Sequence, residues 1–123
     1  MHKTSGVVAI VEDDSGMRRS IERLLQANGY ATAAFPSAEE FLASDTLNRA
    51  TGLVLDIHLQ GISGIELRRQ LLVTNPTIPV VFITAFDDHH TRADALAAGC
   101  VEYLQKPFDA HRLIEALERC RQP

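Results

Sequence analysis

The apolar residues of this 123-residue chain fall into two kinds of pattern. Some form short unbroken runs, at 7–11, 53–55 and 80–83, and others recur every three or four positions between polar residues. An unbroken run of this length is typical of a strand that is buried on both faces of a sheet. The mixed runs at 30–35 and 101–105 predict two further strands, each only partly buried.

Between and after the strands, apolar residues at helical spacing predict five helices. Ser37 with Glu40 three residues later forms a capping box, and Asn28-Gly29 ends the first helix. The predicted helices extend from Met17 to Asn28, from Ser37 through Leu42, from Ser63 or Gly64 to Asn75, from Asp87-Asp88 to Gly99, and from Asp109 through Leu117. The expected apolar stripes include Phe41, Leu42, Leu67, Leu71, Leu72, Ala93, Leu96, Ala97, Leu113, Ile114 and Leu117.

Strict alternation of strands and helices predicts an α/β fold with a parallel sheet covered on both faces. Central strands are the ones buried on both sides, so the mixed second and fifth strands belong at the edges. The order 2-1-3-4-5 meets this condition, which is that of a flavodoxin-like, doubly wound sheet. Its switch point lies between the first and third strands. We expect a single domain over residues 1–123.

Composition narrows the class of protein. Hydrophobic residues make up 46% of the chain, and no apolar run approaches the roughly 20 residues of a membrane helix. The polar amino terminus lacks the apolar core of a signal peptide, so we expect a cytoplasmic protein with reduced cysteines. With a net charge of −4 and no basic patch, the domain is not expected to bind DNA or a membrane directly.

Reactive side chains follow four of the five predicted strands. Glu12 and Asp13 end the first, Asp56 the third, Thr84 the fourth and Lys106 the fifth. Carboxylates gathered at one switch point repel each other, which raises a pKa unless a cation such as Mg²⁺ neutralises them. An aspartate can attack phosphorus, and a lysine and a hydroxyl can bind phosphoryl oxygens. The pattern therefore indicates phosphoryl transfer to Asp56.

The motifs at these strand ends resemble those of the receiver domain of two-component response regulators, and the match covers nearly the whole chain. The residues that carry the resemblance are Ile10-Val11-Glu12-Asp13-Asp14, Leu55-Asp56, Gly61-Ile62-Ser63-Gly64, Ile83-Thr84-Ala85 and Lys106-Pro107-Phe108. It implies that Asp56 accepts a phosphoryl group from a sensor histidine kinase. The domain would catalyse only its own phosphorylation and dephosphorylation.

The resemblance also implies roles for the neighbouring residues. Glu12, Asp13 and Asp56, together with the backbone carbonyl of His58, would hold Mg²⁺. Thr84 would hydrogen-bond the phosphoryl group and Lys106 would pair with it. Tyr103 matches the switch aromatic that turns inward on activation, and the Lys106-Pro107 bond is expected to be cis.

Some positions depart from the commonest family pattern. Gln60 stands where the family usually has proline, which predicts a less rigid loop after Asp56. Glu12 replaces the more frequent aspartate and can reach a metal through water. His58 and Phe86 occupy the variable places two residues after Asp56 and Thr84, which in the family tune the lifetime of the phosphorylated form.

The segment 36–42 and the general spacing are most similar to FixJ-type regulators, in which a helix-turn-helix DNA-binding domain follows the receiver. The chain is therefore either a stand-alone receiver or the receiver of a longer transcription regulator. We favour the second, in which DNA is contacted only through the output domain. The output face would comprise the fourth helix, the fifth strand and the nearby last helix, where a phosphorylation-dependent homodimer could form. Its members would include Arg92, Ala95, Leu96 and Glu102.

Three alternative functions need separate consideration. A haloacid-dehalogenase-type phosphatase also places a strand-end aspartate on phosphate, but it needs a second acid where this chain has His58. A flavodoxin-like nucleotide binder would need a Gly-rich loop after the first strand, where Glu12-Asp13 stand instead. A degenerate receiver that binds a protein partner without phosphorylation is opposed by the complete set of acidic, hydroxyl and lysine residues.

Overall fold

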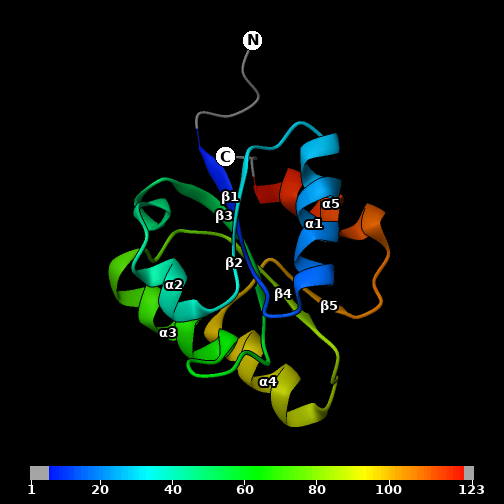
Figure 1. Cartoon of the computed structure of the whole chain (residues 1–123). Coiled ribbons are helices and arrows are strands. Elements are labelled where there is room, and N and C mark those ends of the chain that lie inside the picture. Colours follow the sequence, from blue (N-terminus) through cyan, green and yellow to red (C-terminus); the bar gives the residue numbers. More distant parts are fainter. Residues whose placement is uncertain (1–5, 121–123) are drawn as a thin grey trace.

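Five parallel strands form one sheet in the predicted order, β2-β1-β3-β4-β5 (Figure 1). The computed structural model describes residues 6–120. The strands are β1 (Val7–Val11), β2 (Thr32–Phe35), β3 (Ala50–Asp56), β4 (Val80–Thr84) and β5 (Glu102–Gln105). The flavodoxin-like α/β class predicted from the sequence is therefore confirmed. None of the helices within residues 6–120 has the length and apolar character needed to cross a membrane.

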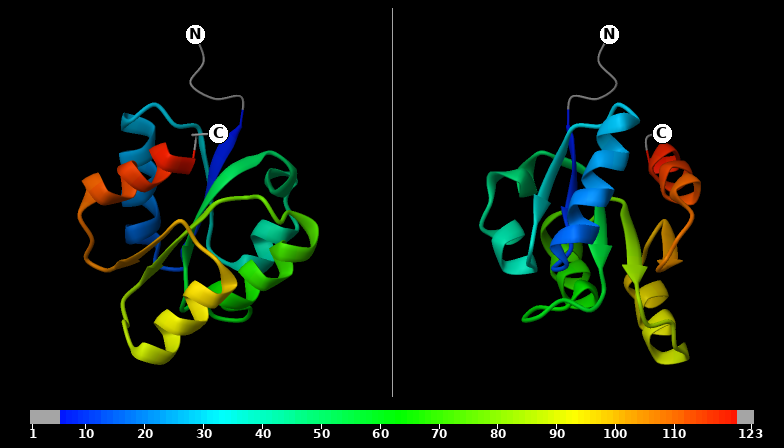
Figure 2. Two further views of the ribbon diagram at one scale, coloured as in Figure 1. Left: turned by 180° about the vertical axis from the view of Figure 1, so that it is seen from behind. Right: turned by 45° about the vertical axis from the view of Figure 1, so that its right-hand side comes forward.

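The helices cover both faces of the sheet, as Figure 2 shows. They are α1 (Ser15–Ala27), α2 (Ala38–Leu42), α3 (Gly64–Thr74), α4 (His89–Ala98) and α5 (Ala110–Cys120), with a short 3-10 helix, η1 (Asp45–Asn48), before β3. One apolar core forms beneath α2, α3 and α4, and a second forms beneath α1 and α5. The short helix η1 was not predicted from the sequence, because a single turn is too short to show a period of apolar residues.

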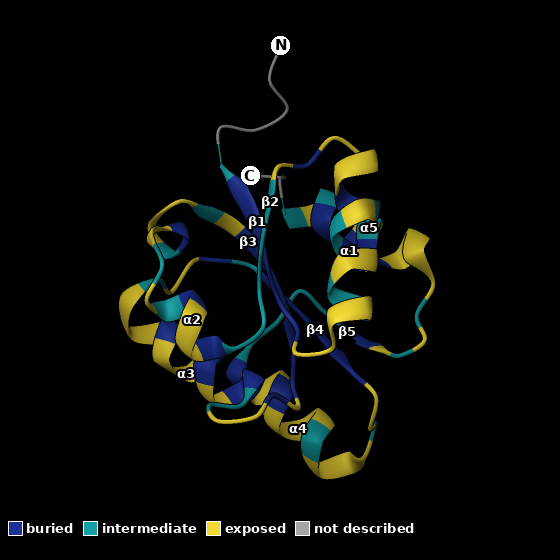
Figure 3. Cartoon of the chain, in the orientation of Figure 1, coloured by how far each residue is buried: buried dark blue, intermediate teal, exposed yellow. Residues whose placement is uncertain are grey.

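Alternate residues of the central strands enter opposite cores. In β1, Val8 and Ile10 join the core under α1 and α5, whereas Ala9 and Val11 join the other. All five residues of β1 are buried, which explains the unbroken apolar run in the sequence (Figure 3). The edge strand β2 has four partly exposed residues, in accord with its mixed composition.

Side-chain caps fix where the helices begin. Asp14, Ser37, Ser63 and Asp88 each accept a hydrogen bond from the backbone N–H three residues later. Such a cap satisfies a donor that the first helical turn leaves free. Asp14, Ser63 and Asp88 belong to loops that follow β1, β3 and β4, so they also set the geometry of the sheet's carboxyl edge.

The apolar stripe predicted for α3 was wrong at one residue, and the stripe predicted for α4 was wrong throughout. Leu72 on α3 is 41% exposed, and Ala93, Leu96 and Ala97 on α4 all face solvent. The residues of α4 that enter the core are Ala95 and Ala98, and Ala95 therefore does not belong to the exposed output face predicted for it. Helix α4 is rich in alanine, so its apolar residues alone do not distinguish a buried side from an exposed one.

A buried arginine that the sequence did not reveal ties α3 to α4. Arg68 is only 8% exposed, and its Nε donates to the carbonyls of Ala98 (3.3 Å) and Gly99 (3.0 Å). Its Nη1 donates to the carbonyl of Ile78 at 3.1 Å. Burial lowers the pKa of Arg68, yet the three carbonyls supply partners for the charged group.

Replacement of Arg68 by methionine should lower the free energy of unfolding by about 2–3 kcal/mol, because three buried carbonyls lose a charged donor. The adjacent Arg69→Met is the control, since Arg69 is half exposed and lies 3.9 Å from its partner Glu66. We expect that control to change stability by about 0.5 kcal/mol or less. Urea denaturation of both variants measures the difference; equal midpoints would contradict the role of Arg68.

Candidate functional site

Three carboxylates meet at the switch point between β1 and β3. Glu12 and Asp13 follow β1 directly, and Asp56 is the last residue of β3. One carboxylate oxygen from each lies within 4.8 Å of the other two. Glu12 is fully buried and Asp56 is 4% exposed, whereas Asp13 is open to solvent. The parallel sheet thus brings together the acidic residues that the sequence predicted at this edge.

Lys106 bridges two of these carboxylates. Its Nζ lies 2.7 Å from Glu12 Oε1 and 3.3 Å from Asp56 Oδ2. The lysine follows β5, and its backbone N–H donates to the carbonyl of Thr84 at 2.7 Å. The Lys106-Pro107 peptide bond is cis, as the family resemblance implied.

Burial dominates the electrostatics of this group. It raises the pKa of Glu12 to about 7, although hydrogen bonds from Lys106 and from the Asp14 backbone oppose the rise. Burial also disfavours the charge of Lys106, but the hydrogen bond to Glu12 and the charge of Asp56 outweigh it and raise the lysine pKa. Repulsion between Glu12 and Asp56, which the sequence predicted, contributes less to the Glu12 shift than burial does.

The loop after β3 returns closely on Asp56. The backbone N–H of His58 donates to Asp56 Oδ1 at 3.1 Å, and the N–H of Gly64 donates to the carbonyl of Ile57 at 2.9 Å. A Cβ at position 64 would collide with the backbone of Asp56, so only glycine permits α3 to begin this close to the site. The Gly64 of the predicted motif therefore has a steric role.

The donor set suits a hard divalent cation. Three carboxylates from Glu12, Asp13 and Asp56 offer oxygen ligands, and the exposed side at Asp13 leaves room for water. Zinc and softer metals are usually bound through sulfur or imidazole. Among residues 6–120, the cluster consists of three carboxylates and contains neither group. The residues therefore fit the predicted metal site, while the part assigned to the His58 carbonyl stays a prediction.

Thr84 is fully buried at the end of β4, one residue after Ile83, which pairs with Asp56 of the neighbouring strand. Its hydroxyl donates to the carbonyl of Phe86 and accepts from the N–H of the same residue, both at 3.0 Å. A hydroxyl has a single proton. In this structure that proton is therefore used to hold the loop between β4 and α4.

The same loop holds Tyr103 of β5 through Asp87. The Tyr103 hydroxyl donates to Asp87 Oδ1 at 3.1 Å, and Arg92 binds both oxygens of this carboxylate, at 3.2 and 2.7 Å. The Arg92 guanidinium also lies 4.8 Å from the centre of the Tyr103 ring. Arg92 lowers the pKa of Asp87, and burial with the bond to Asp87 raises that of Tyr103 to about 12. Tyr103 is therefore a neutral donor at physiological pH.

Sequence reasoning missed several contacts of the site. Arg18 Nη1 donates to the backbone carbonyl of Glu12 at 2.9 Å. The rings of His58 and Phe86 meet edge to face with centroids 5.3 Å apart, which joins the loops after β3 and β4. The partnership of Asp87 with Arg92 and Tyr103 was also missed. The nearest signal was the acidic pair Asp87-Asp88, which was interpreted only as a helix start.

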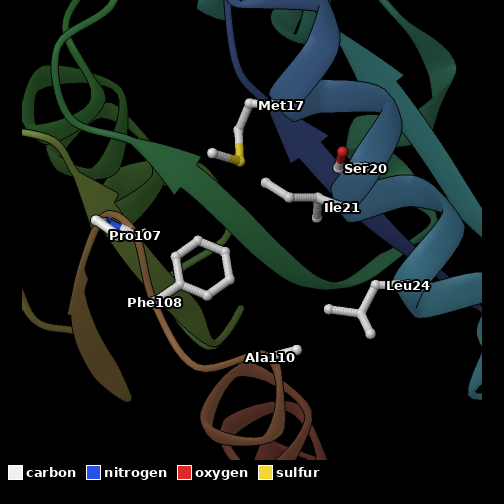
Figure 4. A pocket seen from close by; sticks show the side chains of 7 residues that line it. All are labelled: Met17, Ser20, Ile21, Leu24, Pro107, Phe108 and Ala110. Atoms are coloured by element: carbon white, nitrogen blue, oxygen red, sulfur yellow. The ribbon is translucent and has the colours of Figure 1, made fainter.

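An apolar hollow lies beside the site, between α1 and the segment that follows Lys106. Figure 4 shows its lining, and its volume is about 290 Å³. The lining residues are Met17, Ser20, Ile21, Leu24, Pro107, Phe108 and Ala110. Ser20 supplies the one hydroxyl among them, so this hollow lacks the charged groups that characterise the acidic site.

Known proteins share both the sequence pattern and the fold. The family model of the response regulator receiver domain matches residues 8–118. Nodulation protein W of Bradyrhizobium diazoefficiens is 39% identical over 114 residues, which cover 93% of this chain and 50% of that protein. The transcriptional regulatory protein FixJ of Rhizobium meliloti is 38% identical over 116 residues, which cover 94% and 57%.

The crystal structure of FixJ-N agrees with this fold at a TM-score of 0.84 and 35% identity, covering 95% of this chain and 94% of that one. The chain spans about half the length of the curated relatives that it matches. The family model covers nearly all of the described sheet and helices, including every strand end of the acidic site. This chain belongs to the response regulator receiver domain family.

Proposed function

We propose that Asp56 is the phosphoacceptor of this receiver domain and that a sensor histidine kinase supplies the phosphoryl group. A carboxylate oxygen of Asp56 attacks phosphorus, and the bond from phosphorus to the histidine nitrogen of the kinase breaks. The observation that supports this role is the position of Asp56 in the switch-point cluster, with Lys106 Nζ 3.3 Å from Oδ2. The domain acts only on itself, in phosphorylation and in later hydrolysis.

The groups around Asp56 would have separate roles in binding the metal ion and the phosphoryl group. Glu12 and Asp13 would hold Mg²⁺ with Asp56 and the His58 carbonyl, and the bound cation would neutralise charge on the phosphoryl oxygens. Lys106 is already beside Asp56, so its ammonium can pair with a phosphoryl oxygen after a small movement. The His58 backbone N–H orients the other carboxylate oxygen, Oδ1.

Phosphorylation would act on the output side through Thr84. If the Thr84 proton goes to the phosphoryl group, the Phe86 carbonyl loses its donor and the loop before α4 is released. That loop carries Asp87, which holds Tyr103 and Arg92. Tyr103 would then turn inward, and the equilibrium between two conformations would shift.

The family relationship suggests what kind of protein contains this domain and which surface transmits the signal. The receiver would be part of a longer cytoplasmic transcription regulator, because FixJ is a transcriptional regulatory protein and the match covers only 57% of its length. DNA would be contacted by an output domain outside this sequence, and a phosphorylation-dependent dimer would use the face of α4, β5 and α5. Arg92, Leu96 and Glu102 contribute surface there, but the buried Ala95 does not.

Incubation with acetyl phosphate and Mg²⁺ should add one phosphoryl group to the wild-type protein and none to Asp56→Asn, because the amide is not a nucleophile toward phosphorus. Intact-mass spectrometry measures the adduct. Asp45→Asn, on the exposed turn of η1, is the control and should label as the wild type does. Absence of an adduct on all three proteins, with no binding of beryllofluoride, would favour the phosphorylation-independent binding module.

Mg²⁺ should bind more tightly as the pH rises from about 6 to about 8. The proton on Glu12 competes with the metal below its pKa of about 7, so the Kd should fall by up to about tenfold per pH unit in the acid range. Isothermal titration calorimetry at several pH values measures this. Glu12→Gln should bind more weakly and show a flatter dependence, whereas an equal Kd at both pH limits would contradict the prediction.

Replacement of Asp87 by alanine should release Tyr103 and Arg92 and favour the conformation with Tyr103 turned inward. We expect phosphorylation by acetyl phosphate to become faster, by up to about fivefold, since the bonds that are lost are partly exposed. The control Asp94→Ala removes the same charge from an exposed position of α4. Identical rates for both variants would mean that Asp87 does not restrain the switch.

A further inference from the structure

A side chain of helix α2 forms a hydrogen bond with the loop that follows β3. Glu39 lies in the first turn of α2, and its Oε2 accepts a hydrogen bond from the backbone N–H of Ile62 at 2.9 Å. The two residues are 23 positions apart in the sequence. A bond to a carboxylate is charge-assisted and stronger than one between neutral groups.

Gly61 provides the space for this carboxylate. Its φ of +78° lies in the left-handed region, and a Cβ on residue 61 would collide with the carboxylate of Glu39. The Glu39 head group therefore occupies the place that a side chain at position 61 would need. Backbone conformation and side-chain contact thus agree in placing Glu39 over this turn.

The loop is otherwise held at its two ends. Near Asp56, the N–H of His58 binds Oδ1, and near α3 the N–H of Gly64 binds the carbonyl of Ile57. Among residues 6–120, Glu39 makes the one hydrogen bond to the backbone of positions 59–62. Apolar packing of Leu59 and Ile62 against the core adds to it.

Glu39 itself starts from a rigid base. Ala38 and Phe41 of α2 are fully buried, and the Phe41 ring meets that of Phe35 edge to face at 5.5 Å. Ser37 caps the helix by accepting from the N–H of Glu40. Because the helix is anchored on both sides of Glu39, the contact can restrain the loop rather than move with it.

We propose that Glu39 is a positioning residue for the phosphoacceptor site. It holds the turn at 61–62 so that the His58 backbone keeps the position needed to orient Asp56 and to offer its carbonyl to a metal ion. Position 60 is glutamine, which leaves φ free, so the restraint comes from α2 instead of from a proline within the loop. The effect of Glu39 on the metal ion and the phosphoryl group rests on the proposed function, whereas the restraint of the loop by Glu39 does not.

Three variants separate this role from a loss of charge. Glu39→Ala removes the acceptor, Glu39→Gln keeps an oxygen that can accept from Ile62, and Glu40→Ala removes the same charge from the next exposed position of α2. In Mg²⁺-free protein, amide hydrogen exchange followed by NMR should show faster exchange at Ile62 in Glu39→Ala, by about tenfold. Glu39→Gln should lie within about threefold of the wild type, and Glu40→Ala should match it.

The functional readout is the dependence of phosphorylation on Mg²⁺. Glu39→Ala should bind Mg²⁺ about 5- to 30-fold more weakly in calorimetry, as expected when a group that supports ligands is lost. Its rate with acetyl phosphate should fall at low Mg²⁺ and recover at saturating Mg²⁺, because the chemical groups are intact. Glu39→Gln should restore most of the affinity.

The outcomes are distinct. Equal Ile62 exchange and equal Mg²⁺ affinity in Glu39→Ala and Glu40→Ala would overturn the positioning role. Faster exchange with unchanged Mg²⁺ affinity would also overturn it, because the restraint would then not reach the site. Failure of the wild type itself to bind Mg²⁺ would refute the proposed function, whereas the exchange difference would still report the loop restraint.

Discussion

The structure depends on the placement of buried charge at the carboxyl edge of the sheet. Glu12 has no exposed surface, and Lys106 contacts both Glu12 and Asp56. Buried carboxylates without a cation partner would be strongly destabilising, so the lysine after β5 and the acids after β1 and β3 stabilise one another. The strand order therefore brings these charged side chains within contact distance of one another. Their contacts in turn hold the ends of β1, β3 and β5 together.

Around this group, the backbone approaches as closely as glycine permits. Gly64 lets α3 begin against the backbone of Asp56, and Gly61 leaves room for the Glu39 carboxylate. Gly61 lies in the loop after β3 and Gly64 is the first residue of α3, so this loop is fixed by α2 on one side and by α3 on the other. The loop that follows Asp56 is thereby tied to both α2 and α3.

On the other side of the site, side-chain hydrogen bonds hold the loop between β4 and α4. Thr84 uses its hydroxyl proton on the Phe86 carbonyl, and Asp87 next in the chain binds Tyr103 and Arg92. These contacts are individual hydrogen bonds, part-buried at Thr84 and Tyr103 and exposed at Arg92, and each contributes a modest free energy. The loop after β3 is thus held by two helices, whereas the loop after β4 is held by a few side-chain hydrogen bonds.

Most of the fold and the reactive residues were predictable from the sequence. Unbroken and mixed apolar runs identified the strands and their order, and that order placed Glu12, Asp13, Asp56, Thr84 and Lys106 at one edge. The prediction succeeded because the spacing of apolar residues shows which side of a strand or helix is buried. Parallel strands also place their carboxyl ends at the same edge of the sheet. Helix α4 was the exception, because its several alanines do not distinguish the buried side of the helix from the exposed side.

Only the tertiary structure decided the partners of Glu39, Arg68 and Asp87. Glu39 lies 23 positions from its partner, and Asp87 lies 16 positions from Tyr103. Arg68 lies 30 and 31 positions from the two carbonyls that its Nε contacts. Charged residues on a helix or in a loop look alike in a sequence, because whether one meets a backbone carbonyl, an amide, another side chain or solvent depends on how the elements pack. The sequence by itself therefore determined the strand order and the chemistry at the strand ends. Packing determined which charged side chains hold that chemistry in place.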